Sequence, residues 1–250
     1  RLWLFARYFY AFPLYPLFFK RSISLSQRLF RGRSFDSFFA RLDARLFGPQ
    51  PTLRMHALTP EGGFVDELLA FGYFVYYVIL VFGWWLLFGQ GRTDEALYGF
   101  TIVTISHYLL YIFYVFFPVQ GPKYYFPKER QRIYERLDGL VFTSYVKKVF
   151  GKMNLAGAAF PSSHVALSLL SLFLYFQSST VLGIALVPLV LLVFLSTVYV
   201  FSHYVVDSIA GLAVGVVLFL LVPWLVKILE PAMAVVDAAL GVVLGLSVIG

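Results

Sequence analysis

The stretch LLAFGYFVYYVILVFGWWLLF, which runs from Leu68 to Phe88, decides the fold class. It contains no charged residue, and at about 1.5 Å per helical residue it is long enough to cross the roughly 30 Å hydrocarbon core of a bilayer. Three more segments combine a similar length with a mostly apolar composition: Ala96–Phe117, Val181–Phe201 and Val206–Leu229. We therefore expect four membrane-spanning helices from these segments alone.

Three further segments bring the expected number of spans to about six. Ser163–Phe176 is shorter, but the apolar run from Leu155 to Phe160 before it predicts a helix that opens from a loop at the membrane edge. At the two ends, Leu2–Phe19 and Ala232–Ile249 are apolar, and each is compatible with a span or with a helix that lies beside the bundle. The predicted fold class is all-α, a polytopic transmembrane helical bundle of about six spans.

The composition of the whole chain agrees with a membrane protein. Apolar residues make up 60% of the chain and charged residues 13%, which is about half the roughly 25% usual in globular proteins. A soluble enzyme, a disordered tail and a disulfide scaffold are therefore excluded, and the absence of cysteine excludes a thiol nucleophile and a Cys-ligated metal site. The net charge of +7 points to anionic headgroups or phosphate ligands before nucleic acid.

An amphipathic segment, Ser34–Phe47, precedes the bundle and predicts a helix that lies in the headgroup layer. One face is apolar and the opposite face is charged; the apolar set is Phe35, Phe38, Phe39, Leu42 and Leu46, and the charged set is Asp36, Arg41, Asp43 and Arg45. An aqueous helix packed on the bundle is the alternative. We divide the chain into residues 1–66, a hydrophobic segment with a basic interfacial region, and residues 67–250, the bundle with motifs at 123–130, 161–164 and 196–207.

Basic residues are unevenly distributed along the chain. If Leu68–Phe88 and Ala96–Phe117 both cross, residues 20–66 and 118–154 share one side of the membrane and hold sixteen of the twenty Lys and Arg residues. The positive-inside rule makes that side cytoplasmic. Basic residues that bind substrate do not obey this rule, so the side that the site faces stays open.

The segment STVYVFSHYVVD, Ser196–Asp207, joins two spans and carries a chemical signal. His203 and Asp207 are four residues apart, so on a continuing helix they share a face and the carboxylate can accept the imidazole N–H. A histidine oriented in this way presents its other nitrogen as a nucleophile or general base. The alternative is structural, with Asp207 as a helix cap and His203 as an interfacial residue.

A second signal is the tetrapeptide Pro161-Ser162-Ser163-His164, which opens the short span. Unpaired N–H groups at a helix start, two hydroxyls and an imidazole together form an anion site, and an ordinary serine N-cap is the alternative. Two crossings separate His164 from His203, so we expect both histidines at the same face of the membrane.

The third signal lies in the basic loop Pro118–Asn154, where Lys123 and Arg130 are seven residues apart. Lys supplies a point charge and Arg a bidentate fork, which together suit a tetrahedral phosphate, although a cluster that holds acidic lipid is the alternative. Six further basic residues of this loop are predicted to be lipid anchors: Lys128, Arg132, Arg136, Lys147, Lys148 and Lys152.

Together these groups predict a phosphoryl-transfer site. Cations and helix N–H groups stabilise the phosphoryl oxygens, one histidine attacks phosphorus, and the other protonates the leaving oxygen. We predict no cofactor, and the expected partners are a lipid phosphate substrate and membrane lipids, with no nucleic acid. Two alternatives stay open: a metal hydrolase with His164, His203 and Asp207 as ligands, and a transporter or lipid-binding protein without turnover.

The three motifs resemble the signature of the type 2 phosphatidic acid phosphatase (PAP2) superfamily, which reads K-x6-R-P, then P-S-G-H, then S-R-x5-H-x3-D. The resemblance covers Pro118–Gly215 and implies a six-span bundle and a metal-independent reaction through a phosphohistidine. It further implies these roles by motif position: His203 as nucleophile, Asp207 as its orienting partner, His164 as general acid, and Lys123, Arg130, Ser162 and Ser163 as the phosphate cradle.

The chain departs from that signature at three positions. Gln131 stands for the Pro, Ser163 for the Gly and Thr197 for the Arg, and the last change removes a phosphate ligand that Arg132 or Lys128 could replace. The Ser-Thr-Val-Tyr sequence before His-Tyr, with Gly-Pro-Lys-Tyr in the loop, is more similar to the inositol phosphorylceramide synthase-like branch. Members of that branch move a phospho-headgroup from a lipid to an alcohol.

Two histidines remain outside the motifs. His107 lies in the middle of a span, where an ionisable residue indicates either function or a neutral imidazole bonded to a neighbouring helix. His56, in a loop, is predicted to be solvated. The predicted location is a cell membrane, which the chain crosses several times.

Overall fold

The computed structural model describes residues 9–137, 141–152 and 156–244, and within these ranges it contains helices and no strand. The all-α prediction is therefore confirmed. The helices are η1 (Phe12–Leu14), α2 (Tyr15–Leu29), α3 (Asp36–Phe47), α4 (Pro51–Ala57), α5 (Phe64–Gly89), α6 (Thr93–Phe116), α7 (Pro122–Tyr125), α8 (Pro127–Arg136), α9 (Phe142–Lys152), α10 (Ser163–Ser178), α11 (Thr180–Tyr199) and α12 (Val205–Leu244).

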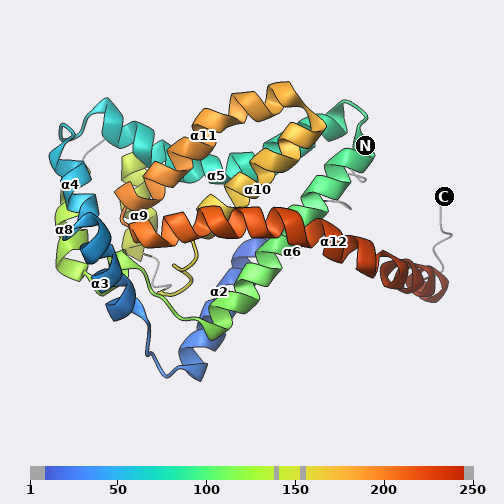
Figure 1. The fold of residues 1–250 in the computed structure, drawn as a ribbon, viewed down its shortest axis with the longest axis horizontal. Helices are drawn as coiled ribbons and strands as arrows, with labels where there is room; N and C mark the ends of the chain where they lie inside the picture. The colour runs from blue at the N-terminus through green and yellow to red at the C-terminus, as the bar shows by residue number, and fades with distance from the viewer. Residues whose placement is uncertain (1–8, 138–140, 153–155, 245–250) are drawn as a thin grey trace.

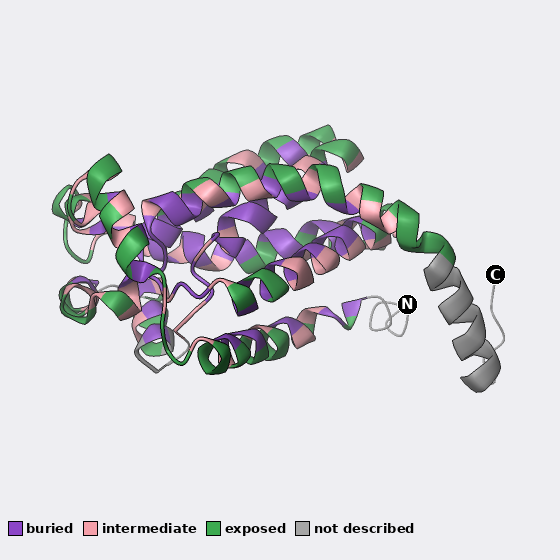
Figure 2. Ribbon diagram, turned by 60° about the horizontal axis from the view of Figure 1, so that its bottom comes forward, coloured by how far each residue is buried: buried purple, intermediate pink, exposed green. Residues whose placement is uncertain are grey.

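Four of the described helices are long and apolar enough to cross a membrane, as the sequence predicts: Phe64–Gly89, Thr93–Phe116, Thr180–Tyr199 and Val205–Pro231. Their outward surfaces are apolar, as on α12, where Leu220 is 68% exposed, and on α11, where Val181 is 79% exposed (Figure 2). Water does not tolerate so many exposed apolar side chains on neighbouring helices, but lipid tails do. The protein is therefore a membrane protein.

The short helix α10 is the centre of the bundle, because it packs against all four of the long helices (Figure 1). Two glycines of α12 allow the close approach: a Cβ at Gly211 would lie 2.8 Å from the Ser162 carbonyl oxygen, and one at Gly215 would lie 2.7 Å from the Ala166 carbonyl oxygen. The helix that opens with the Pro-Ser-Ser-His tetrapeptide is therefore the best-enclosed element of the fold.

The expected number of about six spans is not confirmed. Residues 232–244 continue α12 without a turn, so Ala232–Ile249 does not start a separate crossing helix, and its last five residues lie outside the described part. At the other end, residues 1–8 lie outside the described residues, and α2 begins only at Tyr15 and passes through Lys20 to Leu29. Pro16 occupies the first turn of α2, where its missing N–H costs no hydrogen bond.

The helices α3, α4, α7, α8 and α9 gather at one end of the bundle, where α5 and α12 begin and α6 and α11 end (Figure 1). Contacts between α3 and α4, α3 and α7, and α4 and α8 join the two basic segments there. The described parts of residues 20–66 and 118–154 therefore lie at the same end of the bundle, the arrangement that the sequence predicts.

The amphipathic segment forms the expected helix, α3, but two acids of its charged face are buried. Asp36, Phe39 and Asp43 form the buried face of α3, whereas Phe38 is 55% and Leu46 62% exposed. The reason is that both carboxylates accept backbone N–H groups of neighbouring loops, while the apolar face is left toward the exterior. Because the exterior of a membrane protein at this depth is partly lipid, an outward apolar face costs less there than in water.

Candidate active site

His203 lies in the turn between α11 and α12, and its ring is fixed by a backbone carbonyl. Its Nδ1–H donates to the Ala159 carbonyl at 2.7 Å, and because a carbonyl can only accept, the lone pair of the neutral ring is on Nε2. Its own backbone N–H and that of Ser202 both donate to the Thr197 carbonyl at 3.1 Å. Burial lowers the pKa of His203 to about 3, with a smaller contribution from the Lys123 charge, so the imidazole is neutral near pH 7.

Asp207 does not bond directly to His203, which corrects one prediction. Its Oδ2 is 3.7 Å from His203 Nδ1 and instead accepts the Tyr204 N–H at 2.9 Å, while the Asp207 carbonyl accepts the Ser162 N–H at 3.0 Å. The turn before α12 brings the carboxylate back to its own backbone, as in an N-cap, and the ring turns to Ala159. Asp207 Oδ1 is buried with no hydrogen-bond partner.

His164 lies in the first turn of α10 with both ring nitrogens buried and without a hydrogen-bond partner. Its ring stacks beside Tyr73 and Tyr76, with ring centroids 4.4 and 4.2 Å away, and lies 5.9 Å from the His203 ring. Buried imidazole nitrogens that bond to nothing are costly, and such a cost is typical of a site that waits for a ligand. The predicted convergence of the two histidines is thus present in the structure.

The two serines before His164 hold the start of α10. Ser162 is fully buried and is the N-cap, because its Oγ accepts the Val165 N–H at 3.4 Å; Ser163 is the first helical residue and is also buried. The N-cap alternative therefore describes the Ser162 side chain. The first turn of α10 still directs its N–H groups toward the site.

Lys123, on α7, brings positive charge to the histidines, and Arg130, on α8, lies near Lys123. Lys123 Nζ lies 4.0 Å from the centroid of the Phe150 ring, and in the part of the chain that the structure describes it has no carboxylate partner. Burial, followed by the nearby Arg130 charge, lowers the pKa of Lys123 to about 7. A buried cation that bonds to rings rather than to an acid is available to an incoming anion.

The position of the missing motif arginine is closed. Thr197 is fully buried between α11 and α12, where its Oγ1 donates to the Phe194 carbonyl at 2.8 Å and contacts Ser208 Oγ at 3.0 Å. Of the two predicted replacements, Lys128 shares an open groove with Arg130, and Arg132 is not among the residues that line it. Lys128 is therefore the better placed of the two.

Two groups near the site were not anticipated as site residues. The Asp36 carboxylate accepts the N–H groups of Gln120 and Gly121 at 2.8 and 2.9 Å and so fixes the loop that leads to Lys123. Asp43 Oδ1 accepts the Val206 N–H at 3.0 Å. On α5, Tyr73 and Tyr76 are three residues apart and both contact the ring of His164. Their hydroxyl groups repeat within an otherwise apolar span, and this pattern is visible in the sequence.

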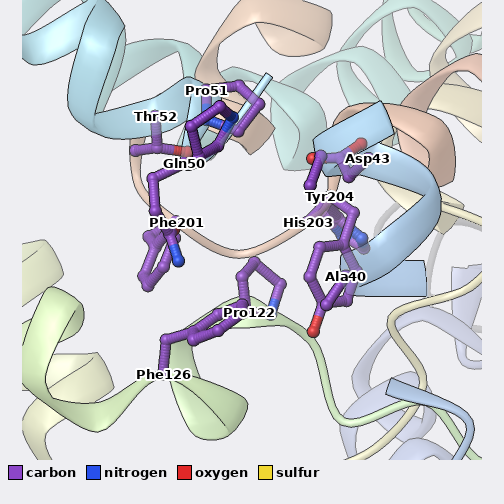
Figure 3. Close-up of a pocket in the computed structure, with 12 residues that line it drawn as sticks. Ala40, Asp43, Gln50, Pro51, Thr52, Pro122, Phe126, Phe201, His203 and Tyr204 are labelled. Carbon is purple, nitrogen blue, oxygen red and sulfur yellow. The ribbon is translucent and has the colours of Figure 1, made fainter. Parts of the chain in front are cut away.

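A pocket of about 110 Å³ reaches His203 from the side of α3 (Figure 3). Its lining residues are Ala40, Asp43, Ala44, Pro49, Gln50, Pro51, Thr52, Pro122, Phe126, Phe201, His203 and Tyr204. The nucleophile candidate is therefore accessible from outside although only 5% of its surface is exposed.

The two histidines outside the motifs are structural. His56 is buried rather than solvated, because α4 packs on the end of α11: its Nε2–H donates to the Tyr199 carbonyl at 3.0 Å, and burial lowers its pKa. His107 accepts the Tyr76 hydroxyl at Nε2 at 2.9 Å and bonds the Val103 carbonyl through Nδ1 at 3.2 Å. Of the two interpretations that the sequence allows for His107, the structure therefore favours an imidazole bonded to a neighbouring helix.

The described residues contain no group of three or more His, Asp or Glu side chains placed to hold a metal ion. Two of the proposed ligands are also engaged elsewhere, His203 Nδ1 with Ala159 and Asp207 Oδ2 with Tyr204. The donor set therefore favours anion binding.

The comparisons with known proteins agree with the motifs. A family model described as PAP2 superfamily matches residues 37–221, which is more than half of the chain and extends from α3 into α12. The comparison with curated proteins and the comparison with solved structures each find no match.

Proposed function

Because the chain belongs to the PAP2 superfamily, a family of phosphatase-type enzymes, we propose that it is an integral membrane lipid-phosphate phosphatase or phosphotransferase that works through a phosphohistidine on His203. One observation carries the proposal: His203 Nδ1–H is held by the Ala159 carbonyl, so the free lone pair is on Nε2, while the His164 ring lies 5.9 Å away with both nitrogens unpaired.

In the first half of the reaction, Nε2 of His203 attacks phosphorus and the bond from phosphorus to the leaving oxygen breaks. Lys123, Arg130 and the N–H groups of the first turn of α10 stabilise the charge on the phosphoryl oxygens. His164 donates its proton to the leaving oxygen, and the bound anion favours the protonated imidazole that this step needs.

In the second half, water or an alcohol attacks the phosphohistidine, the N–P bond breaks, and His164 takes the proton of the attacking hydroxyl. Hydrolysis and transfer differ only in that acceptor. The carbonyl of Ala159 keeps the ring orientation through both steps, and the carboxyl oxygen Oδ2 of Asp207, 3.7 Å from Nδ1, lies close enough to stabilise the positive phosphoimidazole. The resemblance to the inositol phosphorylceramide synthase-like branch favours transfer.

The proposal is tested with purified protein and a panel of phospholipids and prenyl phosphates, with and without alcohol acceptors, and products identified by mass. His203→Ala should abolish product formation with every donor while the far-UV circular dichroism spectrum and unfolding midpoint stay near those of the parent. His56→Gln, a buried histidine outside the site, is the matched control and should retain turnover. Full activity in the His203 variant would sink the mechanism.

We place the enzyme in a cell membrane, with its site at the end that carries the basic segments. Single cysteines at Ser34 and Gln177 test the side, because the chain has no thiol of its own, Ser34 precedes α3 among the basic segments, and Gln177 lies in the last turn of α10, away from its Pro-Ser-Ser-His end. A membrane-impermeant maleimide added to intact cells should label one position and not the other.

A further inference from the structure

The pocket beside His203 differs in charge from the phosphate site. His203 lines it, but Lys123, Arg130 and His164 do not, and it lies between α3, the loop at Pro122 and the turn before α12 (Figure 3). Asp43 is the only Asp, Glu, Lys or Arg among the lining residues. The surroundings of His203 therefore include a cation, Lys123, and, in the pocket, a carboxylate, Asp43.

The walls of the pocket are aromatic and apolar. Phe126, Phe201 and Tyr204 line it together with three prolines, and its polar groups besides Asp43 and His203 are an amide and hydroxyls. A carboxylate beside aromatic rings in a desolvated pocket is an arrangement that recognises organic ammonium groups. A second phosphate would instead be repelled by Asp43. With about 110 Å³, the pocket is several times larger than the roughly 10–15 Å³ that one water needs.

We propose that this pocket binds the ammonium end of a zwitterionic amino-alcohol headgroup, with the headgroup phosphate at Lys123 and Arg130 and the ammonium group at Asp43. The inference rests on the proposed function and names the substrate class of that same site. It also assigns Asp43 of α3, which lies outside the three motifs, as a residue that contacts the substrate.

The proposal determines which bond breaks. His203 Nε2 bonds to phosphorus, the bond from phosphorus to the oxygen of the lipid backbone breaks, and that oxygen takes the proton from His164. The phospho-headgroup stays on His203 with its ammonium group in the pocket. A water or alcohol hydroxyl then breaks the N–P bond and returns its proton to His164.

The first test measures binding and does not depend on turnover. Phosphocholine and glycerol phosphate are compared as soluble ligands by their shift of the unfolding midpoint of the detergent-purified protein. The parent should bind phosphocholine more tightly, and Asp43→Asn should remove the preference. The asparagine oxygen still accepts the Val206 N–H, so the start of α12 keeps its hydrogen bond. Equal binding of the two ligands by the parent would overturn the proposal.

The second test uses lipid donors in mixed micelles. Asp43→Asn should lower kcat/KM for phosphatidylcholine about tenfold or more relative to that for phosphatidic acid, the loss expected when one partner of a desolvated charge pair is removed. Ala44→Leu, at an exposed position of α3 that lines the pocket, should have the same selectivity by occlusion. Asp36→Asn is the matched control, a buried acid of the same helix outside the pocket lining, whose effect should be equal for both donors.

The outcomes separate this inference from the proposed function. Equal losses with both donors in Asp43→Asn would mean that Asp43 only caps α12, and the pocket assignment would be wrong while the His203 mechanism stands. If the parent turns over no donor, the proposed function is wrong. The binding preference for phosphocholine would then still show whether the pocket assignment is right.

Discussion

Replacement of Lys123 by arginine should change the pH dependence of the reaction. With its pKa near 7, Lys123 is protonated in about 90% of molecules at pH 6 and in about 10% at pH 8. The pKa is lowered, so the cation is lost as pH rises through 7, far below the usual range of lysine. If the charge is needed to hold phosphate, kcat/KM should fall about ninefold between pH 6 and pH 8 and about tenfold more by pH 9.

The assay follows kcat/KM from pH 5.5 to 9 with a phosphodiester lipid, whose own charge does not change over that range. Arginine stays protonated throughout, so Lys123→Arg should show a flat profile, at a lower level if the larger guanidinium fits less well against Phe150. Lys123→Met should be low and flat. A parent profile that is flat from pH 6 to 9, or a decline that persists unchanged in the arginine variant, would refute the reasoning.

Three other predictions concern the frame around the site. Gly121→Ala should lower the free energy of unfolding by about 1–2 kcal/mol and reduce turnover, because Gly121 has φ +91° and an added Cβ would lie 2.9 Å from a backbone carbonyl oxygen. Gly89→Ala is the control in thermal unfolding and activity assays, because the space around Gly89 is open. Tyr76→Phe should lower the free energy of unfolding by about 1 kcal/mol, because it removes the hydrogen bond to His107, but should keep most of the activity. Tyr76→Leu should lose much of the activity in the same initial-rate assay. Equal losses of activity in the two variants would exclude a role for the aromatic ring. The pKa of His56 is lower in the folded protein than in the unfolded chain, so the unfolded chain binds the proton more readily and the free energy of unfolding should fall as pH drops below about 6.5. The fall should be smaller in His56→Gln. An equal dependence of the unfolding free energy on pH in the parent and the variant would count against this.

Much of the site was predictable from the sequence, because the number of membrane crossings between two residues determines whether they lie at the same face of the membrane. Two crossings of similar length return the chain to its starting depth, so the spacing of His164 and His203 predicts that they meet, and their ring centroids are 5.9 Å apart. The four long apolar segments were predictable for the same reason, since their length against the bilayer leaves little freedom.

The partner of His203 was not predictable from residue types. The carboxylate four residues away has the right chemistry, but the helix begins between the two residues, and the ring turns to the Ala159 carbonyl instead. Every residue has a carbonyl, so sequence holds no signal for this contact. The contact depends on how the segment that precedes α10 packs against the turn that holds His203.

The burial of two acids of α3 was not predictable from its amphipathic pattern, for a different physical reason. Amphipathic patterns assign charged residues to the outside because water is outside, but here the interior contains unpaired backbone N–H groups that carboxylates satisfy better than apolar side chains do. Asp36 and Asp43 bond three such N–H groups from inside, and Phe38 remains outside. At a membrane edge, acids seven residues apart on one face are therefore evidence for an inward polar contact.

The central claim is that His203 forms a covalent bond to phosphorus, and trapping that bond tests it most directly. The protein is mixed with a lipid donor labelled with ³²P in the phosphate, quenched in alkali within milliseconds to seconds, digested, and the labelled peptide sequenced by mass spectrometry. We expect an acid-labile, alkali-stable label on the peptide that contains His203, absent in His203→Ala. Label on another residue, or full turnover with no label at any quench time, would contradict the mechanism.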